Sequence, residues 1–390
     1  MIYLNNAATT YPKPQCVLDA HAAALLNPPA SQFRSSGTIG KGDVFTQCRE
    51  KLGRLLGIAD AGRIFFSSGA TDSINRILGG LDLSGMQIMT TQTEHNSVLR
   101  PLMNNNDRIG QSTIIPCDSF GRVDIAALEA AMQRGRGLVI INHCSNVTGM
   151  IQDLEQIGVL AQKYHCILMA DVSQSAGCIP IHADAWGIDI LVFTGHKSLF
   201  GVQGTGGYYV SRKLSLRPVM YGGTGRDSSQ PTYENGDYEY EVGTQNAPGI
   251  AALSAGLAYI EERGLQEIQK KEQQLMKQLY RSLEQQESIQ LYGNAENNQG
   301  PVMSFNIKGM SPSDVAYILQ NGYDIVVRTG LHCAPMIHAA LGTGTAGTVR
   351  ISISDLSQEQ DIMELTKAVN QICRATVTGQ QGETSNETGR

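Results

Sequence analysis

The stretch LVFTGHKSLFGVQGTGGYYV, residues 191–210, places a lysine directly after an apolar run. Residues 190–193 read Ile-Leu-Val-Phe, Thr-Gly-His-Lys follows at 194–197, and a glycine-rich turn leads to a second apolar run at 207–210. These runs predict two buried strands, and Lys197 then lies where the first strand ends. Removing a lysine ammonium from water is costly, so this position favours a lysine that is uncharged or covalently engaged.

Short β-rich runs alternate with helical patterns through the middle of the chain. The predicted helices include 72–81, 124–133 and 154–164, and the predicted strands are 63–67, 87–91, 112–116, 137–142, 166–171, 188–194 and 206–210. This alternation predicts an α/β fold with a mainly parallel, doubly wound sheet. Ligand sites in such sheets gather at the carboxyl ends of strands, where Lys197 is expected.

The C-terminal part of the chain is organised differently. Residues 221–246 form a polar, turn-rich stretch that is too long for an ordinary connection, which indicates a functional or interface loop. Apolar periodicity predicts one long helix over about 248–288. We expect a large domain over 13–250, a smaller α+β domain formed by 1–12 and 251–375, and a disordered tail over 376–390.

Composition excludes several classes of function. The 390 residues carry a net charge of −6, which argues against nucleic acid or an anionic membrane as the main partner. No long apolar segment or export signal is evident, so we expect a cytoplasmic protein. The eight cysteines contain no CxxC pair, which favours reduced thiols and predicts no disulfide framework and no metal site.

A lysine neutralised by covalent chemistry indicates a Schiff base, for which pyridoxal phosphate is the common reason. That cofactor needs an anion near its ring nitrogen, a phosphate cradle and a flat group on its ring. Asp171 follows a predicted strand, residues 68–71 (Ser-Gly-Ala-Thr) open a predicted helix, and His95 follows another strand. Taken singly, each feature has a plain alternative, namely a turn residue, an ordinary strand-to-helix turn and a structural histidine.

Nine motifs then occur in an order that resembles one enzyme family. They are YLNNAATTYPKP, SSGATDSIN, TEHNSV, HCSNVTG, DVSQ, TGHKSLFG, YEVGTQN, VRTGLHCAP and GTVR. The chain resembles the class V, fold-type I pyridoxal-phosphate enzymes, and within them the Suf-type (group II) cysteine desulfurases and selenocysteine lyases. The match extends from Tyr3 to about Ile353 and implies a seven-stranded, mainly parallel sheet with a smaller α+β domain.

The resemblance also implies roles for individual residues. Lys197 would form the Schiff base and move protons, His95 would stack on the ring, and Asp171 would pair with the ring nitrogen. Either His95 or Lys197 would be the acid that completes alanine. Two side chains, Gln174 and Asn146, would hydrogen-bond near the ring oxygen and the substrate. The phosphate would be held by Ala70, Thr71, Thr194 and His196, together with Thr244 from a partner subunit. The resemblance therefore implies a homodimer with shared active sites.

Cys333 distinguishes between the reactions that this fold supports. The resemblance implies that its thiolate attacks the sulfur of L-cysteine, which leaves L-alanine and a Cys333 persulfide for an acceptor protein or a reductant. Arg350 would bind the substrate carboxylate, although a surface salt bridge is its plain alternative. Arg328 would lie near the thiol, and both Arg328 and His332 are candidates for lowering the thiol pKa.

Several positions depart from the family pattern and leave the substrate open. Asn5-Asn6 replaces the usual Asp-Asn, Val172-Ser173 places a β-branched residue beside the expected ring, Gln245 replaces a proline, and ISISDLS after Arg350 lacks the usual aromatic residue. A cysteine desulfurase is the main hypothesis. Selenocysteine lyase, aminotransferase or β-lyase chemistry is the alternative, and a non-catalytic sulfur-relay or scaffold protein is the third hypothesis.

Overall fold

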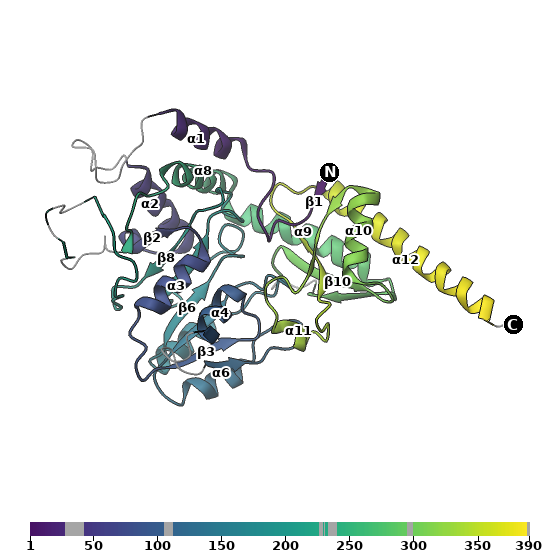
Figure 1. Ribbon diagram of the computed structural model, residues 1–390, viewed down its shortest axis with the longest axis horizontal. Helices are drawn as coiled ribbons and strands as arrows, with labels where there is room; N and C mark the ends of the chain where they lie inside the picture. Colours follow the sequence, from purple (N-terminus) through teal and green to yellow (C-terminus); the bar gives the residue numbers. More distant parts are fainter. Residues whose placement is uncertain are drawn as a thin grey trace.

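The computed structural model describes residues 1–27, 43–104, 112–225, 229, 231, 232, 240–294 and 299–387. It has a large α/β part and a smaller part that carries the N-terminal strand and the C-terminal helix (Figure 1). The loop predicted over 221–246 lies partly outside the described residues. Among the described residues, no helix has both the length and the apolar character needed to cross a membrane.

The large part is built on one sheet of seven strands, and all seven predicted strands are confirmed. In sheet order they are β2 (Ile64–Ser67), β8 (Gly206–Val210), β7 (Ile190–Thr194), β6 (Ile167–Asp171), β5 (Gly137–Asn142), β3 (Gln87–Thr91) and β4 (Ser112–Ile115). Adjacent strands from β7 to β4 pair in parallel, whereas β8 is antiparallel to both of its neighbours. The predicted mainly parallel α/β architecture is therefore confirmed.

Helices cover both faces of this sheet, which explains why its central strands are apolar along their whole length. Leu191 and Phe193 of β7 join the core on one face, and Ile190 and Val192 join the core on the other. Core residues on the first face come from α2 (Val44–Leu56), α6 (Ile125–Met132), α7 (Leu154–Lys163) and α8 (Ala247–Arg263). On the second face they come from α3 (Ala70–Gly80) and α4 (Asn96–Asn104).

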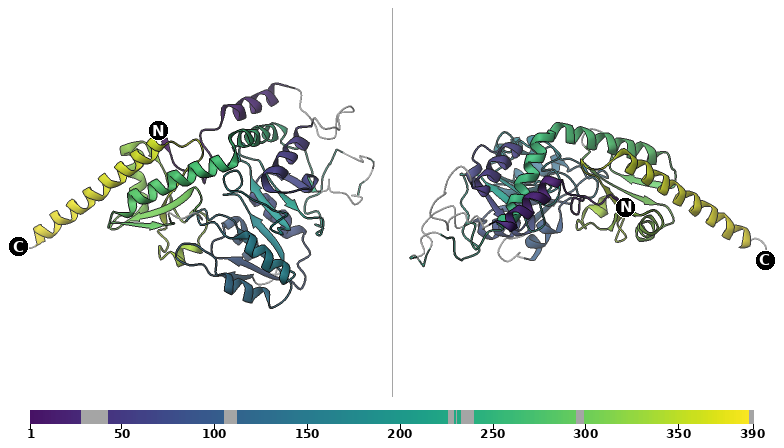
Figure 2. Two further views of the ribbon diagram at one scale, coloured as in Figure 1. Left: turned by 180° about the vertical axis from the view of Figure 1, so that it is seen from behind. Right: turned by 90° about the horizontal axis from the view of Figure 1, so that it is seen from above.

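The small part is an antiparallel sheet in the order β12 (Arg328–Gly330), β13 (Thr348–Ser352), β10 (Val302–Ile307) and β9 (Ile289–Tyr292). Its core includes residues of α9 (Leu265–Glu284), α10 (Pro312–Tyr323) and α12 (Glu359–Glu387). The N-terminal strand β1 (Ile2–Tyr3) pairs in parallel with β11 (Ile325–Val326). After β1, the chain leads through α1 (Gln15–Leu26), which packs on α8 of the large part (Figure 2).

The helix predicted over 248–288 is two helices, α8 and α9. Gly264 joins them with a left-handed φ of +83°, which ends the first helix although the apolar periodicity continues. Ile268, near the start of α9, belongs to the core of the large part, and Leu275 belongs to the core of the small part. The two cores thus meet within α9, later in the chain than the predicted boundary at residue 250.

The sequence predicts a disordered tail over 376–390, whereas in the structure α12 continues as a helix to Glu387. The first half of α12 is anchored in the small core by Ile362, Leu365, Val369 and Ile372. Once a helix is anchored, each added residue contributes one further backbone hydrogen bond, so the helix can extend beyond its packed part. Residues 388–390 lie outside the described part of the chain.

Gly264 gives a stability prediction. Gly264→Ala should lower the free energy of unfolding by about 1 kcal/mol, because alanine is strained at this positive φ. Gly322→Ala, inside α10, should instead raise it by about 0.5–1 kcal/mol, because alanine is the better helix former there. Urea unfolding of both variants measures the difference, and an equal effect of the two substitutions would contradict the role assigned to Gly264.

Candidate active site

A cavity of about 420 Å³ lies at the carboxyl ends of β6 and β7, where the two parts of the molecule meet. The N-terminal segment contributes Ala7 and Ala8 to its wall. The residues singled out in the sequence that line it include Ala70, Thr71, His95, Asn146, Asp171, Ser173, Gln174, Thr194, His196, Lys197, Arg328, His332 and Arg350. Residues far apart in the sequence are thus gathered around one space.

Lys197 lies in a tight turn just after β7. The Lys197 carbonyl accepts a hydrogen bond from Phe200 N at 2.8 Å. In the same turn, Gly195 N donates to Thr205 O and Gly201 N donates to Gly195 O. Burial lowers the pKa of Lys197 to about 8, against the opposing effect of the Asp171 carboxylate. The charges of Arg350 and Arg328 contribute to this lowered pKa, so the amine can lose its proton close to neutral pH.

Asp171 is the last residue of β6 and is almost completely buried. Its Oδ1 accepts a hydrogen bond from Ser173 N at 2.9 Å, and the nearby Gln174 Nε2 donates to Ala7 O at 3.1 Å. Val172 points into the core beneath the sheet, whereas Ser173 faces the cavity. The sequence expectation that Val172 lies beside a bound ring is therefore wrong, because the turn after β6 directs this side chain into the core.

The opposite end of the cavity is the start of α3. Gly69 precedes this helix with φ +147°, and a Cβ added to Gly206 on β8 would come within 2.6 Å of the Gly69 Cα. Glycine thus permits the close approach of the strand to this turn. The backbone N–H groups of Ala70 and Thr71 lie in the first turn of α3, where N–H groups have no partner within a helix and attract anions.

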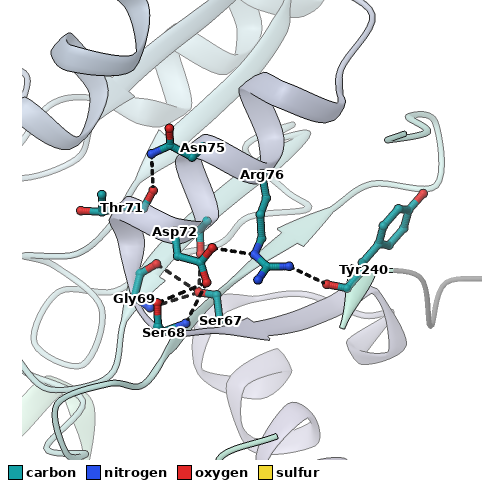
Figure 3. Close-up of polar contacts among 9 residues, drawn as sticks. Ser67, Ser68, Gly69, Thr71, Asp72, Asn75, Arg76 and Tyr240 are labelled. Carbon is teal, nitrogen blue, oxygen red and sulfur yellow. Dashed lines mark hydrogen bonds and ion pairs between the residues drawn. The ribbon is translucent and has the colours of Figure 1, made fainter. Parts of the chain in front are cut away.

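Asp72 also lines this end of the cavity, and its contacts are drawn in Figure 3. Its Oδ2 accepts hydrogen bonds from Ser68 N at 3.1 Å and Ser68 Oγ at 3.2 Å. Its Oδ1 forms an ion pair with Arg76 Nε at 2.7 Å, and Arg76 Nη1 donates to the Tyr240 carbonyl at 3.4 Å. The positive charge of Arg76 offsets the negative charge of Asp72. Asp72 therefore holds the turn in place without making this end of the cavity strongly anionic.

His95 opens α4, where its carbonyl accepts hydrogen bonds from Val98 N and Leu99 N. Its Nδ1 accepts from Ser97 N at 3.0 Å, which leaves the ring proton on Nε2. Burial and the charge of Lys197 lower the pKa of His95 to about 4. The ring is therefore neutral at physiological pH and can lie beside a charged lysine without repulsion.

Arg350, on β13, is only 1% exposed, so the alternative of a surface salt bridge is wrong. Its Nη1 donates to Asn146 O at 3.1 Å and its Nη2 to Asn5 Oδ1 at 3.0 Å. Its Nε is buried without a hydrogen-bond partner among the described residues. Burial and the charge of Arg328 lower the pKa of Arg350 to about 9, and no carboxylate among the described residues forms an ion pair with it.

Cys333 lies in a groove of about 360 Å³ next to the cavity, and the two share Thr71, His95 and Ser97 in their walls. Arg328 Nη2 contacts the Cys333 Sγ at 3.4 Å. His332 and Cys333 both have left-handed φ values, +50° and +59°, which cost on the order of 1 kcal/mol each. Such a backbone persists only where its surroundings hold it.

Hydrogen bonds from the large part hold this loop. Asn146 Nδ2 donates to His332 O at 2.6 Å, and Asn96 N donates to Cys333 O at 2.7 Å. The His332 ring faces Thr348, with Nε2 3.1 Å from its carbonyl, and burial lowers the pKa of His332 to about 2. The ring is uncharged and its Nε2 faces Thr348 of β13, so His332 does not place a positive charge beside the thiol as the sequence hypothesis requires.

One residue predicted to hold the phosphate, Thr244, lies outside the cavity wall. Thr244 is exposed and does not line the cavity of its own chain, which agrees with its expected place at a partner's site but does not test it. Among the described residues, no cluster of three or more His, Cys, Asp or Glu side chains could hold a metal ion.

Sequence reasoning missed Glu94, which is completely buried behind the cavity. Its Oε1 accepts hydrogen bonds from Thr91 Oγ1 at 2.8 Å and Asn142 N at 2.9 Å, and burial raises its pKa to about 8. Lys13 was also missed, although its Nζ donates to His196 O at 2.8 Å. The TEHNSV and YPKP motifs contained both residues, but no local pattern shows that these side chains are buried or what they contact.

The family model of the class-V aminotransferases matches residues 2–365 of this chain. The chain belongs to the class-V aminotransferase family. Among curated family members, it is 32% identical to a probable cysteine desulfurase of Methanothermobacter thermautotrophicus, over 95% of this chain and 94% of that one. A probable cysteine desulfurase of Pyrococcus abyssi is also 32% identical, over 90% and 89% of the two chains.

Solved structures of the family have the same fold. The apo structure of a cysteine desulfurase from Thermococcus onnurineus NA1 has a TM-score of 0.87 at 29% identity, covering 96% of this chain and 95% of that one. The cysteine desulfurase CsdA from Escherichia coli has a TM-score of 0.84 at 25% identity, covering 95% and 94%. This chain is thus similar to these family members over almost its entire length.

The environment of Lys197 can be tested by its reaction with trinitrobenzenesulfonate in cofactor-free protein. The rate should rise with a midpoint near pH 8, below that of an ordinary lysine at about 10.4. Asp171→Asn should move the midpoint lower, because it removes the anion that stabilises the ammonium. Arg350→Met should move it higher, because it removes a repelling cation. Peptide mass spectrometry follows the site, and a wild-type midpoint near 10 would contradict this account.

Proposed function

We propose that this chain is a pyridoxal-phosphate-dependent cysteine desulfurase of the Suf type, which converts L-cysteine to L-alanine and keeps the sulfur as a Cys333 persulfide. The observation that carries the proposal is the thiol of Cys333, which Arg328 contacts beside a cavity that contains Lys197 and Arg350. The named cysteine desulfurases among its relatives support the same activity.

The residues around the cavity fit pyridoxal phosphate. The N–H groups at the start of α3 suit a phosphate, as does the buried His196 Nδ1, which has no hydrogen-bond partner among the described residues. Asp171 lies at the carboxyl end of β6, where a carboxylate suits a protonated ring nitrogen. Asn146 Oδ1, also buried without a described partner, suits a hydrogen-bond donor of the bound substrate or cofactor.

When bound, pyridoxal phosphate supplies an electron sink that makes the Cα proton of an amino acid acidic. Arg350 holds the substrate carboxylate in a paired, charge-assisted contact and so fixes the orientation of Cα. Lys197 Nζ, with its lowered pKa, takes the Cα proton. Because the His95 pKa is about 4, Lys197 rather than His95 holds that proton and returns it when alanine forms.

Cys333 performs the sulfur chemistry. Its thiolate attacks the substrate sulfur, an S–S bond forms, and the Cβ–S bond breaks, so that the electron pair of that bond remains with the three-carbon product. The half-buried loop and its adjoining groove leave the resulting persulfide accessible to an acceptor protein or a reductant. Transfer to that acceptor restores the thiolate for the next L-cysteine.

We also infer a homodimer. Thr244 is exposed in a single chain, and large apolar side chains are exposed on α1 at Leu18, Leu25 and Leu26 and after β8 at Met220 and Tyr221. A partner chain would cover such side chains and would bring its Thr244 to the phosphate end of the cavity. Sedimentation of the purified protein at micromolar concentration tests this inference.

Replacing the thiol gives the decisive test of function. Cys333→Ala should lose sulfide and alanine production from L-cysteine by at least about a hundredfold, because no other atom accepts the sulfur. Cys16→Ala, which removes an exposed thiol on α1, is the control and should retain activity. Full turnover by Cys333→Ala would favour another class-V reaction. Cys144 also lines the cavity, and a loss of activity in Cys144→Ala alone would show that Cys144 accepts the sulfur instead.

The role of Arg350 is tested by comparing L-cysteine with cysteamine, which lacks the carboxylate. Arg350→Lys should lower kcat/KM for L-cysteine about a hundredfold, or about 2.7 kcal/mol, since the paired contact is lost. Turnover of cysteamine should change little. The buried Arg63, which donates to Val210 O away from the cavity, provides the control Arg63→Lys. An equal loss with both substrates would show that Arg350 does not bind the carboxylate.

A further inference from the structure

The N-terminal segment, residues 5–13, joins the two parts of the molecule at the cavity. At its first end, Asn5 forms a β-bridge with Ser352, and Ala7 N donates to Ser352 Oγ at 2.9 Å. Asn5 Oδ1 also accepts the hydrogen bond from Arg350 Nη2. This amide oxygen satisfies one guanidinium nitrogen without adding negative charge, so the positive charge of Arg350 remains available to a ligand.

The second end of the segment holds the turn that carries Lys197. The His196 carbonyl, in the peptide group shared with Lys197, accepts three hydrogen bonds from this segment. The donors are Thr10 N at 3.1 Å, Thr9 Oγ1 at 3.2 Å and Lys13 Nζ at 2.8 Å. In the middle, the Ala7 carbonyl accepts from Gln174 Nε2, which ties the segment to the turn after Asp171.

These contacts form a continuous path between two groups that act on the same substrate. Arg350 lies on the small sheet and Lys197 lies after a strand of the large sheet, so no secondary-structure element contains both. A segment bonded to both constrains their relative position, and a displacement of the reacting amine of about 1 Å can cost a hundredfold in rate. Lys13 is the single ammonium among the three donors, and a charged donor makes the stronger hydrogen bond.

We propose that residues 5–13 act as a strap that couples carboxylate binding at Arg350 to the position of Lys197, with Asn5 and Lys13 as positioning residues. The strap rests on the proposed function in so far as Arg350 binds a carboxylate and Lys197 is the reacting amine. Lys13→Met should lower kcat on the order of tenfold with little change in KM, because it loosens the lysine turn. Asn5→Ala should lower kcat by a similar factor.

A double-mutant cycle measures the coupling. If the strap couples Arg350 to the position of Lys197, breaking either end should remove the same effect. The Asn5→Ala/Lys13→Met double variant should then lose about tenfold in kcat for alanine release, as each single variant does. A loss of about a hundredfold, the product of the two, would overturn the strap. Lys13→Arg, which keeps a charged donor, should restore most of kcat. Lys51→Met provides the control, because Lys51 Nζ makes the same kind of contact with Ser254 O away from the cavity.

Hydrogen exchange of the holoenzyme gives a second readout that does not depend on turnover. Adding L-alanine should slow amide exchange at residues 348–352, around Arg350, and also at residues 195–199, around Lys197. In Asn5→Ala, protection should remain at 348–352 and disappear at 195–199. Protection of both segments in that variant, or of 348–352 alone in the wild type, would overturn the strap. If L-alanine protects neither segment, the carboxylate site itself fails, and the strap fails with it.

Discussion

The structure depends on holding several positively charged side chains around one cavity, where water solvates them poorly. Lys197, Arg328 and Arg350 surround the cavity, and Asp171 is the carboxylate that opposes them in setting the Lys197 pKa. Burial lowers the pKa of both Lys197 and Arg350, so the protein bears the cost of two poorly solvated cations. Under the proposed function, the carboxylate of the substrate and the phosphate of the cofactor would offset these positive charges on binding, so that affinity and reactivity would depend on the same buried cations.

The two-part architecture makes this condition possible. Parallel strands deliver Asp171 and Lys197 to one edge of the large sheet, while the antiparallel strands β12 and β13 deliver Arg328 and Arg350 from the other side. Neither sheet alone would place the four side chains around a common space. The N-terminal segment closes the arrangement, because β1 belongs to the small part and the residues that follow it contact the lysine turn.

Much of this arrangement could be predicted from the sequence, because strand ends are encoded locally. Apolar runs followed by polar residues placed Lys197 and Asp171 correctly, and the Gly69 turn preceded a helix as expected. Gly264 was missed because apolar periodicity continues through it, and residues 376–387 were predicted as part of a disordered tail because their composition alone shows no anchoring core. The orientation of His332, the burial of Val172 and the contact between Asn5 and Arg350 depend on tertiary packing, which a single sequence does not reveal.

The left-handed backbone at His332 and Cys333 depends on how far the chain has folded. The loop's carbonyls are bonded by Asn146 and Asn96 of the large part, whereas the strands on either side of it, β12 and β13, belong to the small part. The strained geometry therefore exists only after both parts have folded and docked. Before the two parts dock, these two hydrogen bonds are absent, so the sulfur chemistry proposed for Cys333 would require the fully assembled chain.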